Sequence, residues 1–275
     1  MSIRGGKTGA VLLGLLALWA DESHAETLNA RYSVRLIGLS LGTAGLNGTF
    51  DSSQYKLEAS AKLTGLASMV SNSRGVAVST GSIQPGRPIP STYATTSSSS
   101  TMTRTVRMGL NAGTVRAVDI SPPIEDSPGR VAVTENHKRG IIDPLSALVM
   151  PVPGNEPLLG PAACNRSIPV YDGYTRFDVN LSFAGTRKVT ANGYSGSVVV
   201  CTARYVPISG HRPDRKVTQF MADNKDMEVW LAPVESARLL VPFKISVATL
   251  VGTTVIEAMD FSIAPGSRAA NAAAR

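Results

Sequence analysis

The sequence predicts an all-β protein with minor helix, built as a single strongly curved antiparallel sheet that forms a partly open barrel or a β-spiral of about a dozen strands. Three observations predict this fold class. Apolar and polar residues alternate with period two in many short segments, glycine-containing turns separate these segments, and helical periodicity is scarce. An antiparallel sheet of this kind buries one face and exposes the other to water.

The clearest predicted strand covers residues 55–63. Tyr55, Leu57, Ala59, Ala61 and Leu63 occupy alternate positions and are separated by charged or hydroxylated side chains. A helix would scatter these five side chains around its axis, whereas a strand places them on one face. Residues 31–36 alternate in the same way and predict the first strand.

The remaining expectations follow from shorter patterns. Further strands are predicted at 74–82, 101–110, 114–120, 168–171, 177–183, 198–206, 217–221, 227–232, 243–249 and 254–262. Short helices are predicted at 66–70 and at 143–148, where Asp143 precedes a proline. The serine- and threonine-rich stretch 91–105 predicts a loop that feeds a polar edge strand.

The N-terminal residues 1–25 have the order of a cleaved signal peptide. Arg4 and Lys7 precede an uncharged run, and Ser23-His24-Ala25 supplies a cleavage site with small residues. The uncharged run is too short to cross a bilayer, and no cysteine stands at the cleavage point to accept a lipid. We therefore expect a soluble, non-lipidated periplasmic protein with one all-β domain over 26–264 and a disordered tail over 265–275.

The net charge is +7 and the isoelectric point is about 9.6. In an exported protein such a charge favours contact with anionic lipid, lipoprotein or another envelope component, although it can also serve solubility alone. Dense Lys/Arg blocks with interleaved aromatics are missing, so a nucleic-acid partner is not expected. No segment after residue 25 is long and apolar enough to predict a transmembrane helix.

Cys164 and Cys201 are the only cysteines in the chain. An exported pair of cysteines is typically oxidised, so the sequence predicts a Cys164–Cys201 disulfide. The alternatives are a reactive thiol pair or half of a metal site. A C-x-x-C spacing is absent and only His137 and His211 follow the signal, so neither a metal nor a cofactor is expected.

No catalytic residue is predicted. Ser53-Gln54-Tyr55-Lys56 matches the S-x-x-K pattern of serine acyltransferases but lacks the companion motifs. The densest cationic patch is the loop 210–216. Its His211, Arg212, Arg215 and Lys216 are candidate contacts for a phosphate or an acidic headgroup, and a solvated turn is the alternative interpretation.

Several segments together resemble an exported bacterial family of unknown function, the one numbered 3108. The segments are YSVRLIGLSLG, LTGLASMVS, DPLSAL, CNRSIPVYDG, VVVC, GHRP, VWLAPV and PFKISVATLVG. The resemblance implies a proteobacterial periplasmic β-sheet protein, similar in fold to lipoprotein carriers or to β-spiral envelope proteins. It carries no known reaction, and function does not follow from fold.

The leading functional hypothesis is a non-enzymatic periplasmic protein that binds an apolar or lipid-bearing ligand in the curved sheet. The alternative is a structural or protein-interaction module for envelope integrity, with a filled core and no ligand. An uncharacterised hydrolase is the third hypothesis. The shape of the sheet distinguishes the first two hypotheses, because a ligand-binding protein needs an open interior.

Overall fold

The computed structural model describes residues 25–51, 53–65, 68, 73–125 and 127–265. Three predictions therefore fall almost wholly outside the described residues. They are the signal peptide at 1–25, the helix at 66–70 and the tail at 265–275, of which only Ala25, Ser68 and Pro265 are described.

The fold is a mostly antiparallel sheet of 14 strands, which confirms the predicted fold class. The strand order is β7-β6-β5-β4-β3-β2-β1-β14-β13-β12-β11-β10-β9, and β8 pairs with β13 beside this path. The strands are β1 (Glu26–Leu36), β2 (Leu39–Phe50), β3 (Gln54–Leu63), β4 (Arg74–Gln84), β5 (Arg87–Ser98), β6 (Thr103–Asn111), β7 (Thr114–Ser121), β8 (Met150–Pro151), β9 (Arg166–Tyr171), β10 (Arg176–Ala191), β11 (Tyr194–Ser209), β12 (Met227–Val234), β13 (Leu239–Thr249) and β14 (Gly252–Pro265). The short helices are η1 (Glu135–Lys138), η2 (Ser146–Leu148), α2 (Pro161–Cys164) and α3 (Lys216–Asp223).

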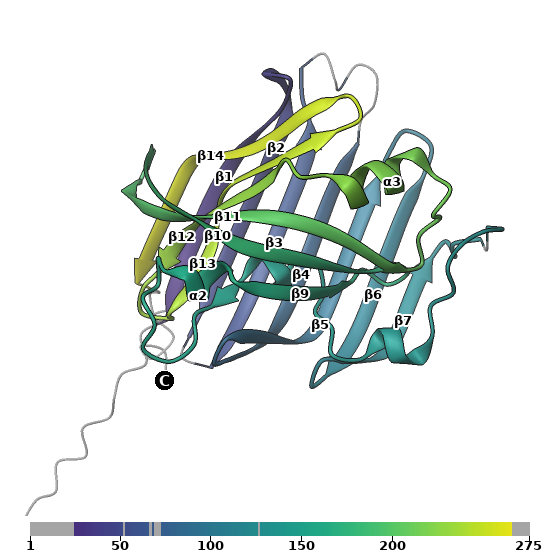
Figure 1. The fold of residues 1–275 in the computed structure, drawn as a ribbon, viewed down its shortest axis with the longest axis horizontal. Coiled ribbons are helices and arrows are strands. Elements are labelled where there is room, and N and C mark those ends of the chain that lie inside the picture. The colour runs from purple at the N-terminus through teal and green to yellow at the C-terminus, as the bar shows by residue number, and fades with distance from the viewer. Residues whose placement is uncertain (1–24, 52, 66–67, 69–72, 126, 266–275) are drawn as a thin grey trace, which may run out of the picture.

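The sheet folds over on itself into two layers. Figure 1 shows β9, β10 and β11 crossing in front of β3 to β7, while β1 and β14 connect the layers at one side. The tip of the β10–β11 hairpin returns to β14, where Asn192 donates from its backbone N–H to the Met259 carbonyl and accepts from the Phe261 N–H. The rings of Tyr194 and Phe261 meet edge to face at 5.3 Å beside this contact.

The two edge strands, β7 and β9, do not pair with each other. The chain that follows β7 passes between them instead. Arg139 bridges to Thr114 of β7, and Ile142 bridges to Val170 of β9. The sheet is therefore curved and barrel-like but not closed.

Buried apolar side chains form two clusters. The larger cluster includes Leu28, Phe50, Leu57 and Phe261. The smaller cluster surrounds the disulfide and includes Val199, Leu231 and Leu240.

Two predictions of secondary structure were wrong. Residues 217–221, predicted as a strand, lie in α3, because an apolar run this short does not distinguish a strand from a helix. Residues 91–98, predicted as a loop, belong to β5, and the next strand, β6, lies between β5 and β7 and not at the edge of the sheet. Threonine is a good strand former, and pairs of threonine hydroxyls bond across the strands, as in Thr80–Thr92 and Thr96–Thr105.

Two further differences concern the extent of the secondary structure. The helix predicted at 143–148 is only the 3-10 turn η2, and β2 extends over a glycine-containing segment for which no strand was predicted. The strands β9 and β10 form a hairpin whose connection is residues 172–175, and Asp172 Oδ1 accepts the N–H groups of Tyr174 and Thr175 within it.

Candidate functional site

The strands β3 to β7 form the rear layer of Figure 1. The inner face of this layer is buried at one end of its strands and open to solvent at the other. Along β3, Tyr55 and Leu57 are buried, Ala59 is half-buried and Ala61 is exposed, although all four face the interior. Along β4, Ser79 is buried whereas Ala77 and Gly75 are half-buried. These alanines are neighbours across the strands, because Ala59 pairs with Ala77 and Ala61 with Gly75. Small side chains therefore leave one end of the interior unfilled.

This opening is a cleft between the layers, which we call the interior cleft. Its narrower section has a volume of about 310 Å³ and is almost wholly apolar. Its lining includes Tyr32, Ala44, Leu46, Ala59, Ala77, Leu148, Pro242, Ile245 and Ile256. Tyr32 links β1 to β13 there, because its hydroxyl donates to the Pro242 carbonyl at 2.7 Å. Burial raises the pKa of Tyr32, so the hydroxyl stays protonated and keeps this bond.

A wider section of about 620 Å³ continues from the narrower one. The two sections share Ala61, Gly75 and Thr95 in their linings. The wider section is more polar, since Lys62, Arg74, Arg104, Asp172 and several serines line it. The Asp172 carboxylate already accepts hydrogen bonds from the N–H and the hydroxyl of Thr175. The Nε of Arg104 is buried and has no hydrogen-bond partner among the described residues. A buried guanidinium nitrogen without an acceptor makes the wall suitable for an anionic group.

A buried polar cluster closes the opposite end of the interior. Asp143 accepts hydrogen bonds from the backbone N–H groups of Leu145 and Ser146 and from the hydroxyls of Ser79 and Ser146. Ser146 also bonds to the Tyr55 hydroxyl at 2.6 Å. Desolvation raises the pKa of Asp143, against the effect of these hydrogen bonds. The cluster anchors the chain segment that bridges the two sheet edges.

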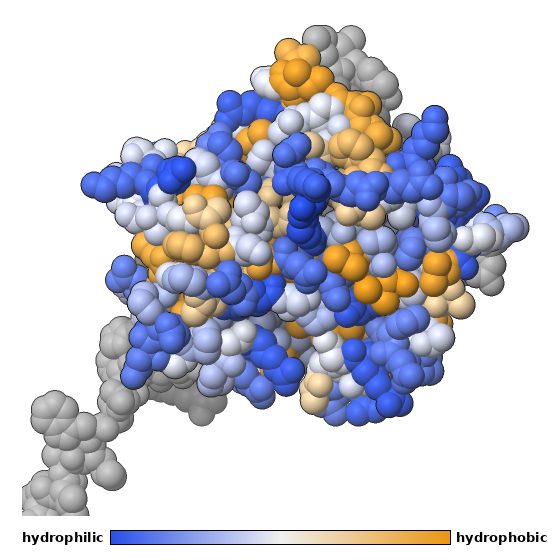
Figure 2. All heavy atoms as spheres, viewed as in Figure 1, coloured by the Kyte–Doolittle hydropathy of each residue, from blue (hydrophilic) through white to orange (hydrophobic). Residues whose placement is uncertain are grey.

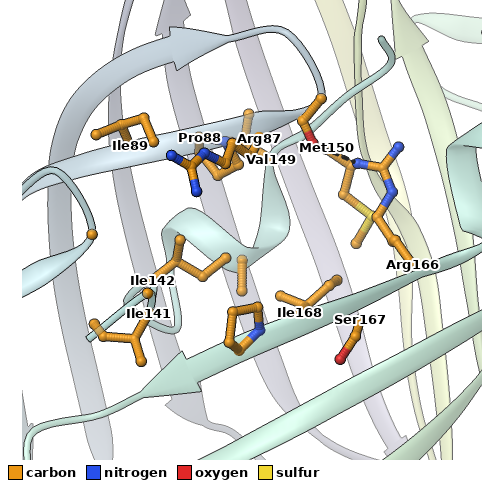
Figure 3. A pocket seen from close by; sticks show the side chains of 15 residues that line it. Arg87, Pro88, Ile89, Ile141, Ile142, Val149, Met150, Arg166, Ser167 and Ile168 are labelled. Atoms are coloured by element: carbon orange, nitrogen blue, oxygen red, sulfur yellow. Dashed lines mark hydrogen bonds between the residues drawn. The ribbon is translucent and has the colours of Figure 1, made fainter. Parts of the chain in front are cut away.

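A smaller pocket of about 220 Å³ lies where β9 passes the start of β5. Figure 3 shows Ile141, Ile142 and Ile168 on its walls, with Arg87 and Arg166 on different sides. The Arg166 guanidinium donates to the carbonyls of Gly86, Pro151 and Ala162, and burial lowers its pKa. Arg166 therefore links three segments of the chain, and three of its hydrogen bonds go to backbone carbonyls.

The predicted cationic loop lies close to the wider section of the cleft. A Cβ on Gly210 would stand 1.9 Å from the carbonyl oxygen of Tyr174, a residue of the cleft wall, so only glycine fits this contact. Arg212 pairs with Asp214, His211 is half-buried, and Arg215 and Lys216 are exposed at the start of α3. The loop thus meets the cleft wall through Gly210, and none of these four residues lines the cleft.

The predicted disulfide forms between Cys164 and Cys201, with a Cα–Cα distance of 5.5 Å. It joins α2 to β11, and both cysteines are fully buried. The bond lies in the smaller core cluster and does not line the interior cleft.

The residues tested for chemistry do not assemble into a site. Ser53 bonds to Asp51, and Lys56 pairs with Glu58. His137 Nδ1 accepts the backbone N–H of Thr134, far along the chain from Ser53. Among the described residues, no group of three His, Cys, Asp or Glu side chains is arranged to hold a metal ion. No described helix has the length and apolarity needed to span a membrane.

The residues that line the interior cleft were not predicted, although the sequence contains a signal for them. Ala59 and Ala61 were assigned to the apolar face of a strand, but their small size was not used. Alanine and glycine recur at the inner positions of three adjacent strands, as Ala44, Ala61 and Gly75. A row of small residues across a sheet leaves volume where larger residues would fill the core.

Fold and cleft together define a curved, barrel-like β-sheet protein with an interior cleft that is apolar at one end and basic at the other. The chain matches the model of the family described as protein of unknown function (DUF3108) over residues 31–259. It therefore belongs to that family. None of the curated proteins matches the chain.

Two solved structures resemble it at low sequence identity. One is the crystal structure of a β-barrel-like protein of the domain of unknown function DUF1849 from Brucella abortus, with 9% identity, a TM-score of 0.49, and coverage of 88% of this chain and 98% of that one. The other is a DUF1329 family protein from Desulfovibrio piger, with 10% identity, a TM-score of 0.23, and coverage of 92% and 90%.

Proposed function

We propose that this protein is a non-enzymatic periplasmic binding protein that holds a single-chain anionic amphiphile in the interior cleft. The observation that carries the proposal is the gradient of exposure along the inner face, from buried Leu57 to exposed Ala61. A structural module with a filled core would have no reason to leave inward alanines in contact with solvent. Pockets for small ligands typically range from about 300 to about 1,000 Å³, and both sections lie in that range.

The division of the cleft suggests how such a ligand lies. An acyl chain fits the narrower section because its wall offers almost no polar group. The acidic headgroup then lies in the wider section, within reach of Arg104, which shares the inner face of β6 with buried Val106. The net charge of +7 favours the same class of ligand. The exposed Arg215 and Lys216 of the nearby loop add positive potential on the approach to the cleft.

Filling the narrower section is expected to weaken binding of an acyl chain. In Ala77→Trp, the indole enters the cleft from the middle of its floor, and affinity for the fluorescent fatty acid cis-parinaric acid falls at least about tenfold. The measurement is a fluorescence titration. Stability changes by no more than about 1 kcal/mol, because the site is only half-buried.

Val78→Trp is the matched control. Val78 follows Ala77 in β4 but lies on the outer face and is 39% exposed. This variant should bind the fatty acid like the unmodified protein. Equal affinity in both tryptophan variants would refute binding in the cleft.

Removing the charge of Arg104 is expected to affect only anionic ligands. Arg104→Gln should weaken binding of the fatty acid about tenfold and leave binding of the corresponding fatty alcohol unchanged, because only the carboxylate accepts from the guanidinium. Competition against cis-parinaric acid measures both ligands. Arg107→Gln is the control, since Arg107 lies on the outer face of the same strand and pairs with Asp119. A similar loss for the alcohol would contradict a headgroup role for Arg104.

A further inference from the structure

Two neighbouring hairpins end in exposed aliphatic side chains. The turn between β1 and β2 presents Ile37 and Leu39, which are 67% and 73% exposed, and the turn between β13 and β14 presents Leu250 and Val251, which are 56% and 66% exposed. We call these four residues the hairpin-tip surface. Figure 2 shows an apolar area at the upper end of the molecule, where Figure 1 places the tips of these hairpins.

The two tips form one continuous surface. The backbone N–H of Ile37 donates to the Thr253 carbonyl at 3.0 Å. A Cβ on Gly252 would stand 2.4 Å from Cγ1 of Ile37, so the Ile37 side chain lies directly against the second hairpin. Large aliphatic residues that gather at protruding turns are unusual for a water-exposed surface, and they mark a site of interaction.

Ile37 occupies its position against the conformational preference of its residue type. Its φ is 50° and the following Gly38 has φ 77°, both in the left-handed region. Asparagine, aspartate or glycine is preferred there, and a β-branched residue with positive φ is an outlier. Folding alone would favour asparagine over isoleucine at this turn. The apolar side chain therefore has a use other than stability.

The hairpin-tip surface lies at the same end of the strands as the open end of the interior cleft. Thr43, Lys62, Arg74 and Ser98 line the wider section, and strand pairing connects them in that order, starting a few residues from the β1–β2 turn. Met102, at the start of β6, continues this rim and is 49% exposed. A ligand that leaves the wider section therefore emerges beside the hairpin tips.

Positive charge adjoins this end. Lys62 and Arg74 are register partners at the ends of β3 and β4 and are exposed. Neither makes an ion pair within the part of the chain that the structure describes. Asp223, Lys225 and Asp226 are exposed near β13 and together carry one net negative charge, which is smaller than the two positive charges of Lys62 and Arg74. Aliphatic side chains at the tips with cations behind them are the arrangement that inserts into an anionic lipid interface.

We propose that this end of the molecule docks on the surface of an anionic bilayer, with the hairpin-tip surface inserted among the headgroups and the cleft facing the membrane. The docking goes beyond the proposed ligand and does not require that the cleft is filled. It gives the cleft a direct path to the lipid phase, so that an amphiphile exchanges with the bilayer without crossing water.

The test is co-sedimentation of the full chain with vesicles of phosphatidylglycerol and phosphatidylcholine in equal parts. We expect binding that weakens at high salt and on vesicles of phosphatidylcholine alone. The double variant Ile37→Asn/Val251→Asn should bind at least about tenfold more weakly. Its thermal midpoint should not fall, because asparagine suits the Ile37 turn. All variants share residues 1–25, so any contribution of that segment cancels in the comparison.

Val78→Asn/Val118→Asn is the matched control, because it removes two exposed valines away from the tips and should bind the vesicles like the unmodified protein. Unchanged binding by the tip variant would overturn the proposal. If the unmodified chain ignores the vesicles but self-associates in analytical ultracentrifugation, and the tip variant does not, the surface joins two copies and the membrane proposal is wrong. The tip variant should still bind cis-parinaric acid, and Ala77→Trp should still bind vesicles. The membrane-docking proposal and the ligand-binding proposal can therefore be refuted independently.

Discussion

Replacing Asp143 with alanine should destabilise the protein by about 4 kcal/mol, the largest effect expected of a single substitution. The carboxylate accepts from two backbone N–H groups and from the hydroxyls of Ser79 and Ser146, all in a fully buried environment. Alanine leaves these donors without an acceptor and away from water. Urea denaturation measures the loss. A change below about 1 kcal/mol would mean that water satisfies the cluster.

Asp143→Asn is the matched control, since it keeps the shape of the side chain and the acceptor for the backbone N–H groups. It also isolates a pH dependence. Burial raises the pKa of Asp143 above the ordinary value of an aspartate, so the folded state binds this proton more tightly than the unfolded state. The stability that this proton contributes is present below the unfolded pKa and is lost as pH rises through the folded pKa.

Relative to Asp143→Asn, the unmodified protein should therefore gain stability as the pH falls from about 7 to about 4. The measurement is the difference in unfolding free energy between the two proteins at several pH values. A difference that grows in the opposite direction would mean that the hydrogen bonds outweigh desolvation and lower the pKa of Asp143.

Removing the disulfide should destabilise the protein by about 4 kcal/mol as well. The bond joins residues separated by 37 positions, so it restricts a long loop of the unfolded chain. Cys164→Ala/Cys201→Ala tests this by chemical denaturation without reductant. The unmodified protein treated with reductant is the control and should lose a similar amount. If the double variant unfolds within about 1 kcal/mol of the oxidised protein, the loop is restricted by other contacts in the unfolded state.

Period-two patterning was sufficient to predict the fold class and most of the strands. Residues 55–63 alternate so regularly that no other structure buries their apolar set, and they form β3. The failures arose where side-chain pattern was weak. Residues 217–221 are too few to show a helical period, and the hydroxyl-rich residues 91–98 form a strand because their neighbours on both sides supply hydrogen-bond partners.

The site was less predictable than the fold. The cationic loop was visible because charged residues are adjacent in sequence, but its approach to the cleft depends on Gly210 meeting Tyr174 from another hairpin. Arg104 was not predicted as a site residue, because the curvature of the sheet determines what surrounds its side chain. The alternation that predicts an inward face does not state how closely the opposite layer covers it.

Photo-crosslinking with a fatty acid that carries a diazirine in its acyl chain tests the central claim most directly, because it records where the chain lies. Mass spectrometric mapping should find adducts on inner-face residues of the narrower section, such as Leu46, Ala59 and Ile245, and Ala77→Trp should lose them. Adducts confined to outer-face residues such as Val78, or equal labelling of Ala77→Trp, would contradict a ligand-binding interior.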